Sequence, residues 1–333
     1  MYEYNLQFKL NDYQQLCSNE LVKAFQQGHN CLLDAVCGAG KTEMLLETIK
    51  LALNKGYKVG FACPRRQLLI ELYERLKEYF CIETIGLVVG GYKYNEQGNF
   101  IFLTCHQLTK YYKYFDLLII DEVDAYPFYN NNDLENAAFL AAKQFIYLSA
   151  TVPPKYYAQV TKNELIHISN NHRHHLQFMP LPAIKKTSSL LVIFHLFSLI
   201  NNLKNDPLII YVPTIKQGKN LEKIVKLFFK KTKFVYSNNL DEEILLKFRN
   251  GELNILISTS VLERGITLKK LNVVIYNADS FIFDEATLLQ ICGRVGRDPI
   301  YYQGVIVLLA KTKTKHMLNC QRKIEKYNEM SYL

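Results

Sequence analysis

The sequence lacks any long uninterrupted run of apolar residues. A membrane-spanning helix needs about 18 such residues in a row, and no stretch of this chain reaches that length. The first residues, MYEYNLQFKLNDYQ, have no basic segment followed by an apolar core, as a secretory signal would require. These absences argue against membrane insertion and a cleaved leader, and they predict a cytoplasmic protein.

Paired cysteines are also missing. The cysteines stand at positions 17, 31, 37, 63, 81, 105, 292 and 320, and no two of them form a Cys-x-x-Cys pair. This spacing argues against a four-cysteine zinc module, and the histidines at 172, 174 and 175 have no neighbouring cysteine or carboxylate set. Cys31 and Cys63 lie in apolar, strand-like runs, where reduced and buried thiols are expected. The sequence therefore predicts no zinc site.

The composition is that of a globular protein with two domains. A length of 333 residues exceeds one ordinary domain and suits two of about 150 residues each. Hydrophobic residues make up 49% of the chain and charged residues 21%, which fits a folded core with a solvated surface. The formal net charge of +9 is compatible with a polyanionic partner, but it does not identify one.

Short apolar runs alternate with longer segments of helical periodicity. In the first half the runs are 31–36, 58–63, 100–105, 115–121 and 144–150, and residues 41–54 and 66–80 carry apolar side chains three and four apart. The pattern restarts after residue 190 with runs at 207–212, 233–237, 254–259, 272–277 and 304–310. Strands separated by helices predict parallel β-α-β units and sheets buried on both faces.

The segment 170–189 separates the two halves. It is polar, contains prolines and lacks periodicity, which is typical of a linker. The chain has no low-complexity tract and no repeat of short period. We therefore predict two doubly wound α/β domains, one at 1–172 and one at 183–333, joined by a hinge.

The most informative motif is Ala-Val-Cys-Gly-Ala-Gly-Lys-Thr at 35–42, between a predicted strand and a predicted helix. Its glycines let the loop wrap a phosphate with backbone N–H groups, and the positive end of the following helix faces the anion. Lys41 is expected to reach the β- and γ-phosphates of ATP, and Thr42 to hold Mg²⁺. Ala35 stands where the strict pattern has glycine. The predicted cofactor-binding residues of this loop are Ala35, Gly38, Ala39, Gly40, Lys41 and Thr42.

Two acidic residues follow the predicted strand at 115–121. A carboxylate at the carboxyl end of a parallel strand points toward the crevice where phosphates bind in such folds. Asp121 suits the Mg²⁺ shell together with Thr42, and Glu122 is placed to polarise an attacking water. The alternative is that both acids cap a following helix. The phosphate-binding motif upstream favours the catalytic interpretation.

The motifs GAGKT, DEVD, Ser149-Ala150-Thr151 and the segment from Gln290 to Arg297 occur in the order seen in superfamily 2 helicases. The resemblance covers nearly the whole chain. It implies the P-loop NTPase core of that superfamily, two tandem RecA-like domains with parallel sheets and ATP held in the cleft between them. An ATP-driven motor acting on nucleic acid is the expected activity.

The resemblance also implies roles for residues outside the phosphate loop. Gln14 resembles the glutamine that reads the adenine, with Gln15 as a neighbour that could be confused with it. Ser149 and Thr151 resemble the motif that couples hydrolysis to movement, although two hydroxyls could equally cap a strand-to-loop turn. A later motif supplies the coupling residues Glu263, Arg264 and Gly265.

The arginine-bearing segment of the second half completes the expected catalytic set. Gln290, Arg294 and Arg297 lie on a helix and turn, and two arginines three apart can face one side. The resemblance implies that the arginines reach the γ-phosphate and neutralise transition-state charge, as arginine fingers do. The alternative is a solvated basic surface.

A nucleic-acid track is implied along the loops of both halves. Superfamily 2 motors hold one strand by its phosphates, and such contacts position the strand without reading its sequence. The residues that match are Arg65, Thr104 and Gln107 in the first half and Thr214, Thr259 and Ser260 in the second. The alternative is that they are ordinary loop residues.

The stretches AVCGAGKTEM, CPRR, DEVDAYPF, LSATVP and QICGRVGR together resemble the ComFA family, late competence ATPases similar to the primosomal helicase PriA. The resemblance implies a cytoplasmic motor at the inner face of the membrane that takes up transforming single-stranded DNA. A phosphoribosyltransferase-like competence protein and the membrane DNA channel are the implied partners. The alternatives are another superfamily 2 DNA motor, of PriA or restriction-translocase type, and a nucleotide-gated DNA-binding protein.

The chain departs from the ComFA pattern in one respect. Members of that family typically carry a four-cysteine zinc-binding segment before the motor, and no such segment precedes Gln14 here. The alternatives are that this lineage lost the segment or that the chain is a shorter relative, and both leave a zinc-dependent partner contact open. The motor motifs are all present.

Overall fold

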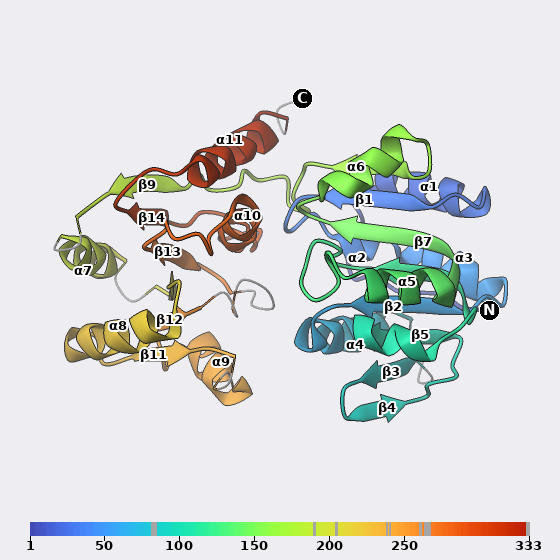
Figure 1. Cartoon of the computed structure of the whole chain (residues 1–333), viewed down its shortest axis with the longest axis horizontal. Coiled ribbons are helices and arrows are strands. Elements are labelled where there is room, and N and C mark those ends of the chain that lie inside the picture. Colours follow the sequence, from blue (N-terminus) through green and yellow to red (C-terminus); the bar gives the residue numbers. More distant parts are fainter. Residues whose placement is uncertain are drawn as a thin grey trace. The chain divides into compact units, whose positions relative to one another are not determined.

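A computed structural model describes residues 1–80, 85–188, 191–203, 206–237, 239, 241–259, 262 and 268–330. The chain divides into two compact units, Met1–His174 and His175–Leu333. Each unit consists of one β-sheet with helices packed on it (Figure 1).

The first unit contains an eight-stranded sheet in the order β4-β3-β5-β2-β6-β7-β1-β8. All neighbouring strands run parallel except β3 and β4, which form an antiparallel hairpin. The strands are β1 Cys31–Ala35, β2 Val59–Cys63, β3 Gly86–Val89, β4 Tyr92–Tyr94, β5 Phe100–Thr104, β6 Phe115–Ile120, β7 Ala142–Ser149 and β8 Ile166–Asn170. The helices are α1 Asp12–Gln26, α2 Lys41–Met44, α3 Leu46–Asn54, α4 Arg66–Phe80, the 3₁₀ helix η1 Cys105–Lys110, α5 Asn132–Ala141 and α6 Pro154–Thr161.

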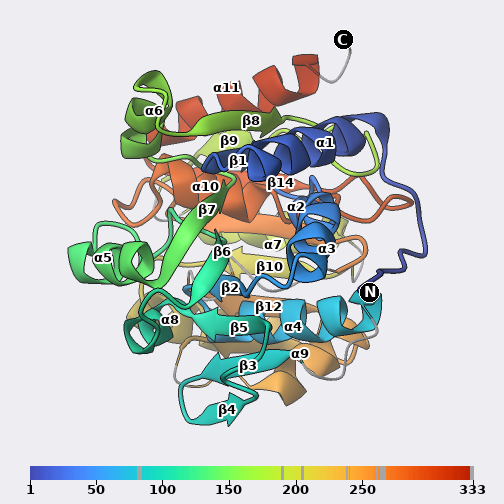
Figure 2. The ribbon, with the colours of Figure 1, turned by 90° about the vertical axis from the view of Figure 1, so that its right-hand side faces the viewer.

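Burial on both faces explains why the central strands of this sheet are continuous apolar runs. Every residue of β2 and β5 is buried, as expected for parallel strands covered by helices on both sides. Figure 2 shows α3 and α4 on one face and α5 on the other. On β6, Leu118 and Ile120 belong to the same core cluster as Leu134 of α5, because alternate residues of a strand point to the same face.

The second unit contains a six-stranded, all-parallel sheet in the order β11-β12-β10-β13-β14-β9. Its strands are β9 Ala183–Lys186, β10 Leu208–Tyr211, β11 Thr232–Val235, β12 Ile255–Ser258, β13 Asn272–Tyr276 and β14 Ile306–Ala310. Its helices are α7 Val192–Asn202, α8 Ile215–Phe228, α9 Glu242–Arg249, α10 Glu285–Cys292 and α11 Lys315–Met330.

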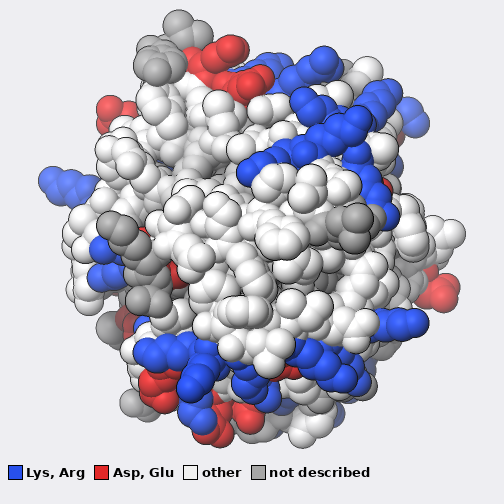
Figure 3. Space-filling model, turned by 90° about the vertical axis from the view of Figure 1, so that its left-hand side faces the viewer, with Lys and Arg blue, Asp and Glu red and all other residues white. Residues whose placement is uncertain are grey.

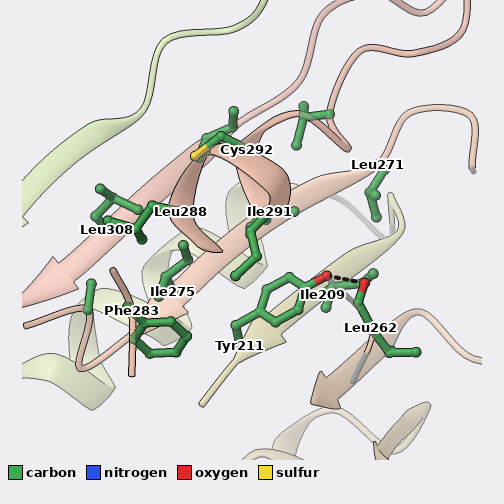
Figure 4. Close-up of a cluster of buried hydrophobic side chains, with 14 of the residues drawn as sticks. Ile209, Tyr211, Leu262, Leu271, Ile275, Phe283, Leu288, Ile291, Cys292 and Leu308 are labelled. Atoms are coloured by element: carbon green, nitrogen blue, oxygen red, sulfur yellow. Dashed lines mark hydrogen bonds between the residues drawn. The ribbon is translucent and has the colours of Figure 1, made fainter. Parts of the chain in front are cut away.

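Two separate clusters of apolar side chains cover the two faces of the second sheet. Ile209 and Tyr211 of β10 belong to one cluster, and Leu208 and Ile210 belong to the other. In the first cluster, the Tyr211 hydroxyl donates a hydrogen bond of 2.7 Å to the Leu262 carbonyl (Figure 4). The buried phenol group therefore keeps a partner inside an apolar core.

The sequence prediction was wrong about part of the segment between the units. Residues 170–189 were predicted as a linker, but Ala183–Lys186 forms strand β9 and pairs in parallel with β14. The strand lies at the edge of its sheet and none of its residues is buried, so it carries no apolar signal. Only residues 171–182 lie outside helices and strands between β8 and β9.

Two further details differ from the predicted pattern. The helix predicted over 41–54 is interrupted at Leu45, which separates α2 from α3. Strands β3, β4 and β8 were not predicted. All three residues of strand β4 are exposed, so its sequence lacks the alternation of apolar and polar side chains that marks a half-buried strand.

Candidate functional site

The predicted site residues of the first unit converge on one edge of its sheet. Lys41 follows β1, Arg65 follows β2, Thr104 ends β5, Asp121 follows β6 and Ser149 ends β7. These strands run parallel, so their carboxyl ends meet at the same edge. Ligands of open α/β sheets bind at this edge. Residues as far apart in sequence as Lys41 and Ser149 are thereby brought to one edge of one sheet.

The phosphate loop has the backbone conformation that its glycines predict. Gly38 and Gly40 have φ angles of 85° and 80°, in the left-handed region that favours glycine. A Cβ atom added to Gly40 would lie 2.3 Å from Nε2 of Gln14. The loop is held at its start by the Val36 N–H, which donates 3.1 Å to the carbonyl of Asn170 on β8. Glycine is therefore required at Gly40 for both conformation and space.

Lys41 and Thr42 lie at the start of α2, directly after this loop. The Lys41 ammonium donates a hydrogen bond of 3.0 Å to the Ala35 carbonyl, which places it beside the loop. The Thr42 hydroxyl accepts a hydrogen bond of 2.9 Å from Nη2 of Arg75 on α4. Nη1 of Arg75 also lies 3.8 Å from the Glu43 carboxylate. Arg75 was not singled out from the sequence, because no motif marks its position in the middle of a helix.

The structure distinguishes Gln14 from its neighbour. Gln14 is 2% exposed and donates from Nε2 to the Ala39 carbonyl at 2.9 Å, so it lies against the phosphate loop. Its Oε1 accepts the Asn11 N–H at 3.0 Å, which completes a capping box at the start of α1. Gln15 is exposed and bonds only locally, to Asn19. Of the two glutamines, Gln14 is the one that reaches the loop.

The acidic segment after β6 is strained and closely packed. Asp121 is 8% exposed, and its Oδ1 accepts the Glu122 N–H at 2.8 Å. Glu122 has a φ of 54°, an uncommon conformation for a residue with a side chain. No helix follows directly, since α5 begins at Asn132 and is capped by Asn131. The alternative that these acids cap a helix is therefore wrong.

Asp124 connects this acidic segment to the Ser-Ala-Thr motif. Its two carboxylate oxygens accept hydrogen bonds from the hydroxyls of Ser149 at 2.8 Å and Thr151 at 2.7 Å. The Ser149 hydroxyl also accepts the Thr151 N–H at 2.9 Å, so the turn-capping alternative holds alongside the contact to Asp124. Asp124 was part of the quoted DEVD motif but received no role from the sequence.

The residues predicted to contact nucleic acid lie in varied surroundings. Arg65 places Nε 3.8 Å from the Glu122 carboxylate, so it faces the acidic segment. Thr104 is 7% exposed, and Gln107 accepts a hydrogen bond from Lys110.

In the second unit, the Thr214 hydroxyl caps α8 by accepting the Gln217 N–H at 3.2 Å. The carbonyl of Thr259 accepts a hydrogen bond of 2.8 Å from the Ser258 hydroxyl. Ser260 and the coupling residues Glu263, Arg264 and Gly265 lie outside the described residues.

The arginine-bearing segment follows α10. Leu288, Ile291 and Cys292 anchor this helix in the apolar core of the unit (Figure 4). The helix ends at Cys292, so the two arginines lie on the turns beyond it and the helical-spacing argument does not apply to them. Gln290 is 7% exposed.

The two arginines differ in their surroundings. Arg294 is 5% exposed, whereas Arg297 is only partly buried and donates from Nε to the Gly293 carbonyl at 3.0 Å. The alternative of a solvated basic surface is wrong for Arg294.

Six of the described cysteines, all except the partly buried Cys37, are buried. Burial raises the pKa of Cys31 to about 12 and raises that of Cys63 well above its ordinary value. Such thiols stay protonated and are poor metal ligands. Among the described residues, no group of three or more His, Cys, Asp or Glu side chains is arranged to hold a metal ion. Within the same residues, no helix is long and apolar enough to cross a membrane.

The face of the second unit that carries α7 and α8 is uncharged in the middle, with lysines and arginines along its upper and lower margins (Figure 3). Its exposed apolar side chains include Phe194, Leu227 and Phe228. A cavity of about 390 Å³ nearby is lined by Leu208 and Ile255, the first residues of β10 and β12. It therefore lies at the opposite end of these strands from Thr214 and Thr259 and does not belong to the candidate site.

Comparisons with known proteins define the class. Residues 7–154 match the family model described as the res subunit of type III restriction enzymes, and residues 189–299 match the helicase conserved C-terminal domain.

Among solved structures, Saccharomyces cerevisiae Dbp5 bound to RNA and ADP BeF3 superimposes with a TM-score of 0.68 at 19% identity, over 96% of this chain and 92% of that one. Mycobacterium smegmatis helicase Lhr, bound to ssDNA and AMP-PNP, gives 0.68 at 16% identity over 97% of this chain and 50% of that one. The chain is a superfamily 2 helicase-type protein with two α/β domains, which confirms the predicted fold class.

Two relatives give the family. The competence protein ComFA of Bacillus subtilis is 33% identical across 97% of this chain and 73% of its own length. ComFA of Streptococcus pneumoniae is 34% identical across 87% of this chain and 70% of its own length. The chain belongs to the ComFA family, as its motifs predicted.

Proposed function

We propose that this chain is a DNA-dependent ATPase that moves along single-stranded DNA and drives DNA uptake during competence. The helicase-type domains and the ComFA relatives support ATP hydrolysis. The observation that carries the proposal is the convergence of the phosphate loop, the acidic segment and the Ser-Ala-Thr motif on one edge of the first sheet. A loop with two left-handed glycines followed by lysine and threonine suits a triphosphate.

The donor set at this edge fits ATP with Mg²⁺. The Thr42 hydroxyl and the Asp121 carboxylate are oxygen ligands of the kind that Mg²⁺ prefers. Thr42 and Asp121 would hold the ion, and its positive charge would offset the negative charge of the phosphates. The backbone of Ala35, Gly38, Ala39 and Gly40 would cradle the phosphates, and Gln14 lies beside the loop, where it can select the base.

We assign the chemical step to four further residues. Lys41 would stabilise the β- and γ-phosphates, and the Glu122 carboxylate would orient and deprotonate the attacking water. Arg294 and Arg297 would neutralise the charge that develops on the γ-phosphate, with Gln290 positioning the water or the phosphate. Ser149 and Thr151, joined through Asp124, would transmit hydrolysis to movement, together with Glu263, Arg264 and Gly265.

The nucleic-acid part of the proposal rests on the family and on backbone-type contacts. Lhr, which shares this fold, is described as bound to ssDNA. Arg65, Thr104, Gln107, Thr214, Thr259 and Ser260 are the residues we propose for contacts with phosphate and sugar. Family membership supports a role in competence at the inner face of the cell membrane, with a phosphoribosyltransferase-like competence protein and the DNA channel as partners.

The test is ATP turnover of the purified chain with and without single-stranded DNA. Turnover should rise several-fold with DNA, and Lys41→Ala should abolish it while the fold is retained. Lys162→Ala, which removes an exposed lysine of the same unit, is the matched control and should leave turnover unchanged. DNA affinity should fall steeply with salt and depend little on sequence, because phosphate contacts dominate.

DNA binding that depends on nucleotide but occurs without ATP turnover would show that the chain is a nucleotide-gated binding protein and not a motor. Turnover that ignores single-stranded DNA, or that Lys41→Ala leaves intact, would reject the proposal. Where turnover does depend on single-stranded DNA, a strand-displacement assay separates translocation along DNA from unwinding of a duplex.

A further inference from the structure

The last residues of the first unit lie along its phosphate loop. The His174 N–H donates 2.9 Å to the Gly38 carbonyl, and Nδ1 of the same ring lies 3.0 Å from that oxygen. The His174 carbonyl in turn accepts a hydrogen bond of 2.9 Å from the Asn11 side chain. His174 is thus fixed to the middle of the loop proposed to hold the phosphates.

Two neighbours of His174 strengthen this attachment. Arg173 is 3% exposed, and its side-chain carbons lie 3.8–3.9 Å from the position of a Cβ on Gly38. The His172 ring stacks on Tyr13, with centroids 3.6 Å apart and planes inclined by 12°. Tyr13 precedes Gln14, so the same short segment contacts the phosphate loop and the start of α1.

The first residue of the second unit is attached in the same way to a different motif. His175 places Nε2 3.0 Å from the carbonyl of Gly296, which lies between Arg294 and Arg297. Its Nδ1 accepts the Gln177 N–H at 3.1 Å. With Nδ1 as the acceptor, Nε2 is the ring nitrogen that donates to the Gly296 carbonyl.

Two consecutive residues are therefore anchored to the two motifs proposed to act on the γ-phosphate. His174 is bonded to the phosphate loop within the first unit, and His175 to the arginine segment within the second. A single planar peptide bond joins them, and it leaves only the torsions on either side free to change. A displacement of Gly38 can thus be passed to Gly296 along the chain itself.

We propose that His174 and His175 are positioning residues that transmit the state of the phosphate loop to the arginine segment. This inference rests on the proposed ATPase function and deepens it. When the loop closes on a nucleotide, the Gly38 carbonyl moves, and His174 follows it. The peptide bond then carries the change to His175, whose ring sets the backbone between the two arginines. Coupling between two sites requires a structural element whose conformation depends on the state of both sites.

Chain insertion tests this inference directly. Two glycines inserted between His174 and His175 leave each anchor able to form but separate them, so the coupling should be lost. We expect kcat for ATP to fall about tenfold or more, which is within the range of typical coupling between sites. The KM for ATP should change less than about twofold, because the loop itself is intact.

The matched control is the same insertion between Gln177 and Phe178. Both residues are exposed, and this insertion lengthens the segment equally while leaving both anchors adjacent. It should keep kcat within about twofold of the parent chain. Equal losses from the two insertions would show that segment length matters and not the adjacent pair, and would overturn the inference.

Side-chain substitutions give a second, independent readout. His174→Ala and His175→Ala should each lower kcat. His174→Asn places an amide N–H near the position of Nδ1, and His175→Gln places one near Nε2, so these variants should restore turnover. If neither His174→Asn nor His175→Gln has a higher kcat than the alanine variant at the same position, the hydrogen bonds are not the cause of the loss. Thermal unfolding of every variant confirms that the fold is kept.

The outcomes separate the inference from the function on which it rests. A parent chain without ATP turnover rejects both. A parent chain that hydrolyses ATP, with unchanged kcat after insertion between His174 and His175, rejects the inference alone.

Discussion

The carboxylate of Asp124 accepts a hydrogen bond of 2.8 Å from the hydroxyl of Ser149. This bond joins the loop that follows β6 to the last residue of the paired strand β7. The Val123 N–H, one residue earlier, donates a hydrogen bond of 3.2 Å to the Leu148 carbonyl, so this loop is connected to the end of β7 through backbone as well as side chains. A shift of the acidic segment must therefore move the Ser-Ala-Thr segment with it.

Ser149→Ala should uncouple DNA from hydrolysis. The change removes one hydrogen bond to a charged acceptor and the cap of Thr151. We expect DNA stimulation of ATP turnover to fall about tenfold, since such bonds are worth about 1.5–3 kcal/mol. Nucleotide affinity should be unchanged. Turnover measured against DNA concentration checks this.

Thr161→Ala is the control for Ser149→Ala. It also removes a hydroxyl hydrogen bond, of 2.9 Å to the Tyr157 carbonyl, but on the far end of α6. An equal loss of DNA stimulation in both variants would show that general destabilisation, and not the contact to Asp124, is responsible.

Gln14→Ala should raise the KM for ATP, because Gln14 is buried against the phosphate loop and bonds to Ala39. It should also cost about 1 kcal/mol of stability, since it removes half of a capping box. Gln15→Ala is the neighbouring control and should change neither quantity, because Gln15 is exposed. ATP titration and thermal unfolding measure the two effects. A larger change in KM for Gln15→Ala would reverse the assignment.

The strands that carry the first-unit site were predictable because they are buried on both faces. Continuous apolar runs such as Val59–Cys63 and Phe100–Thr104 stand out from their flanks, and polar motifs follow directly at their carboxyl ends. Motif order then placed the phosphate loop and the acids on one sheet edge. Both the strand positions and the order of the motifs can be read from local sequence, without knowledge of contacts between distant residues.

The missed features depend on partners that a sequence does not reveal. Arg75 lies in the middle of an amphipathic helix, and only the fold shows that it reaches Thr42. The segment at His174 was read as linker because its polar side chains gave no periodicity. Its contacts are to backbone carbonyls, which leave no pattern in the sequence.

Arg297→Ala should lower kcat far more than it weakens nucleotide binding. An arginine finger acts on charge that develops only in the transition state and is worth about 10³–10⁵ in rate. Arg322→Ala, which removes an exposed arginine of α11, is the control and should leave kcat unchanged. Binding of a non-hydrolysable ATP analogue gives the ground-state comparison. Equal losses in binding and kcat would contradict a transition-state role.

Glu285, the first residue of α10, should contribute stability that depends on pH. Burial tends to raise its pKa, but hydrogen bonds from Lys323 and Asn319 and the charges of Lys323 and His316 outweigh burial, so the pKa is lowered from its ordinary value of 4.5. A carboxyl group with a lowered pKa in the folded state stabilises the fold above its unfolded pKa. That contribution is lost as pH falls below 4.5 through the folded pKa.

Glu285→Gln should therefore lower the unfolding temperature at pH 7 and lose this effect in acid. The pair is partly solvated, so we expect less than about 1 kcal/mol, or about 2 °C. Glu243→Gln breaks an exposed pair with Lys247 on α9 and should have a smaller effect. Thermal unfolding between pH 7 and pH 3.5 measures both. A difference between Glu285→Gln and the parent chain that persists unchanged at the lowest pH would show that the carboxylate charge is not its source.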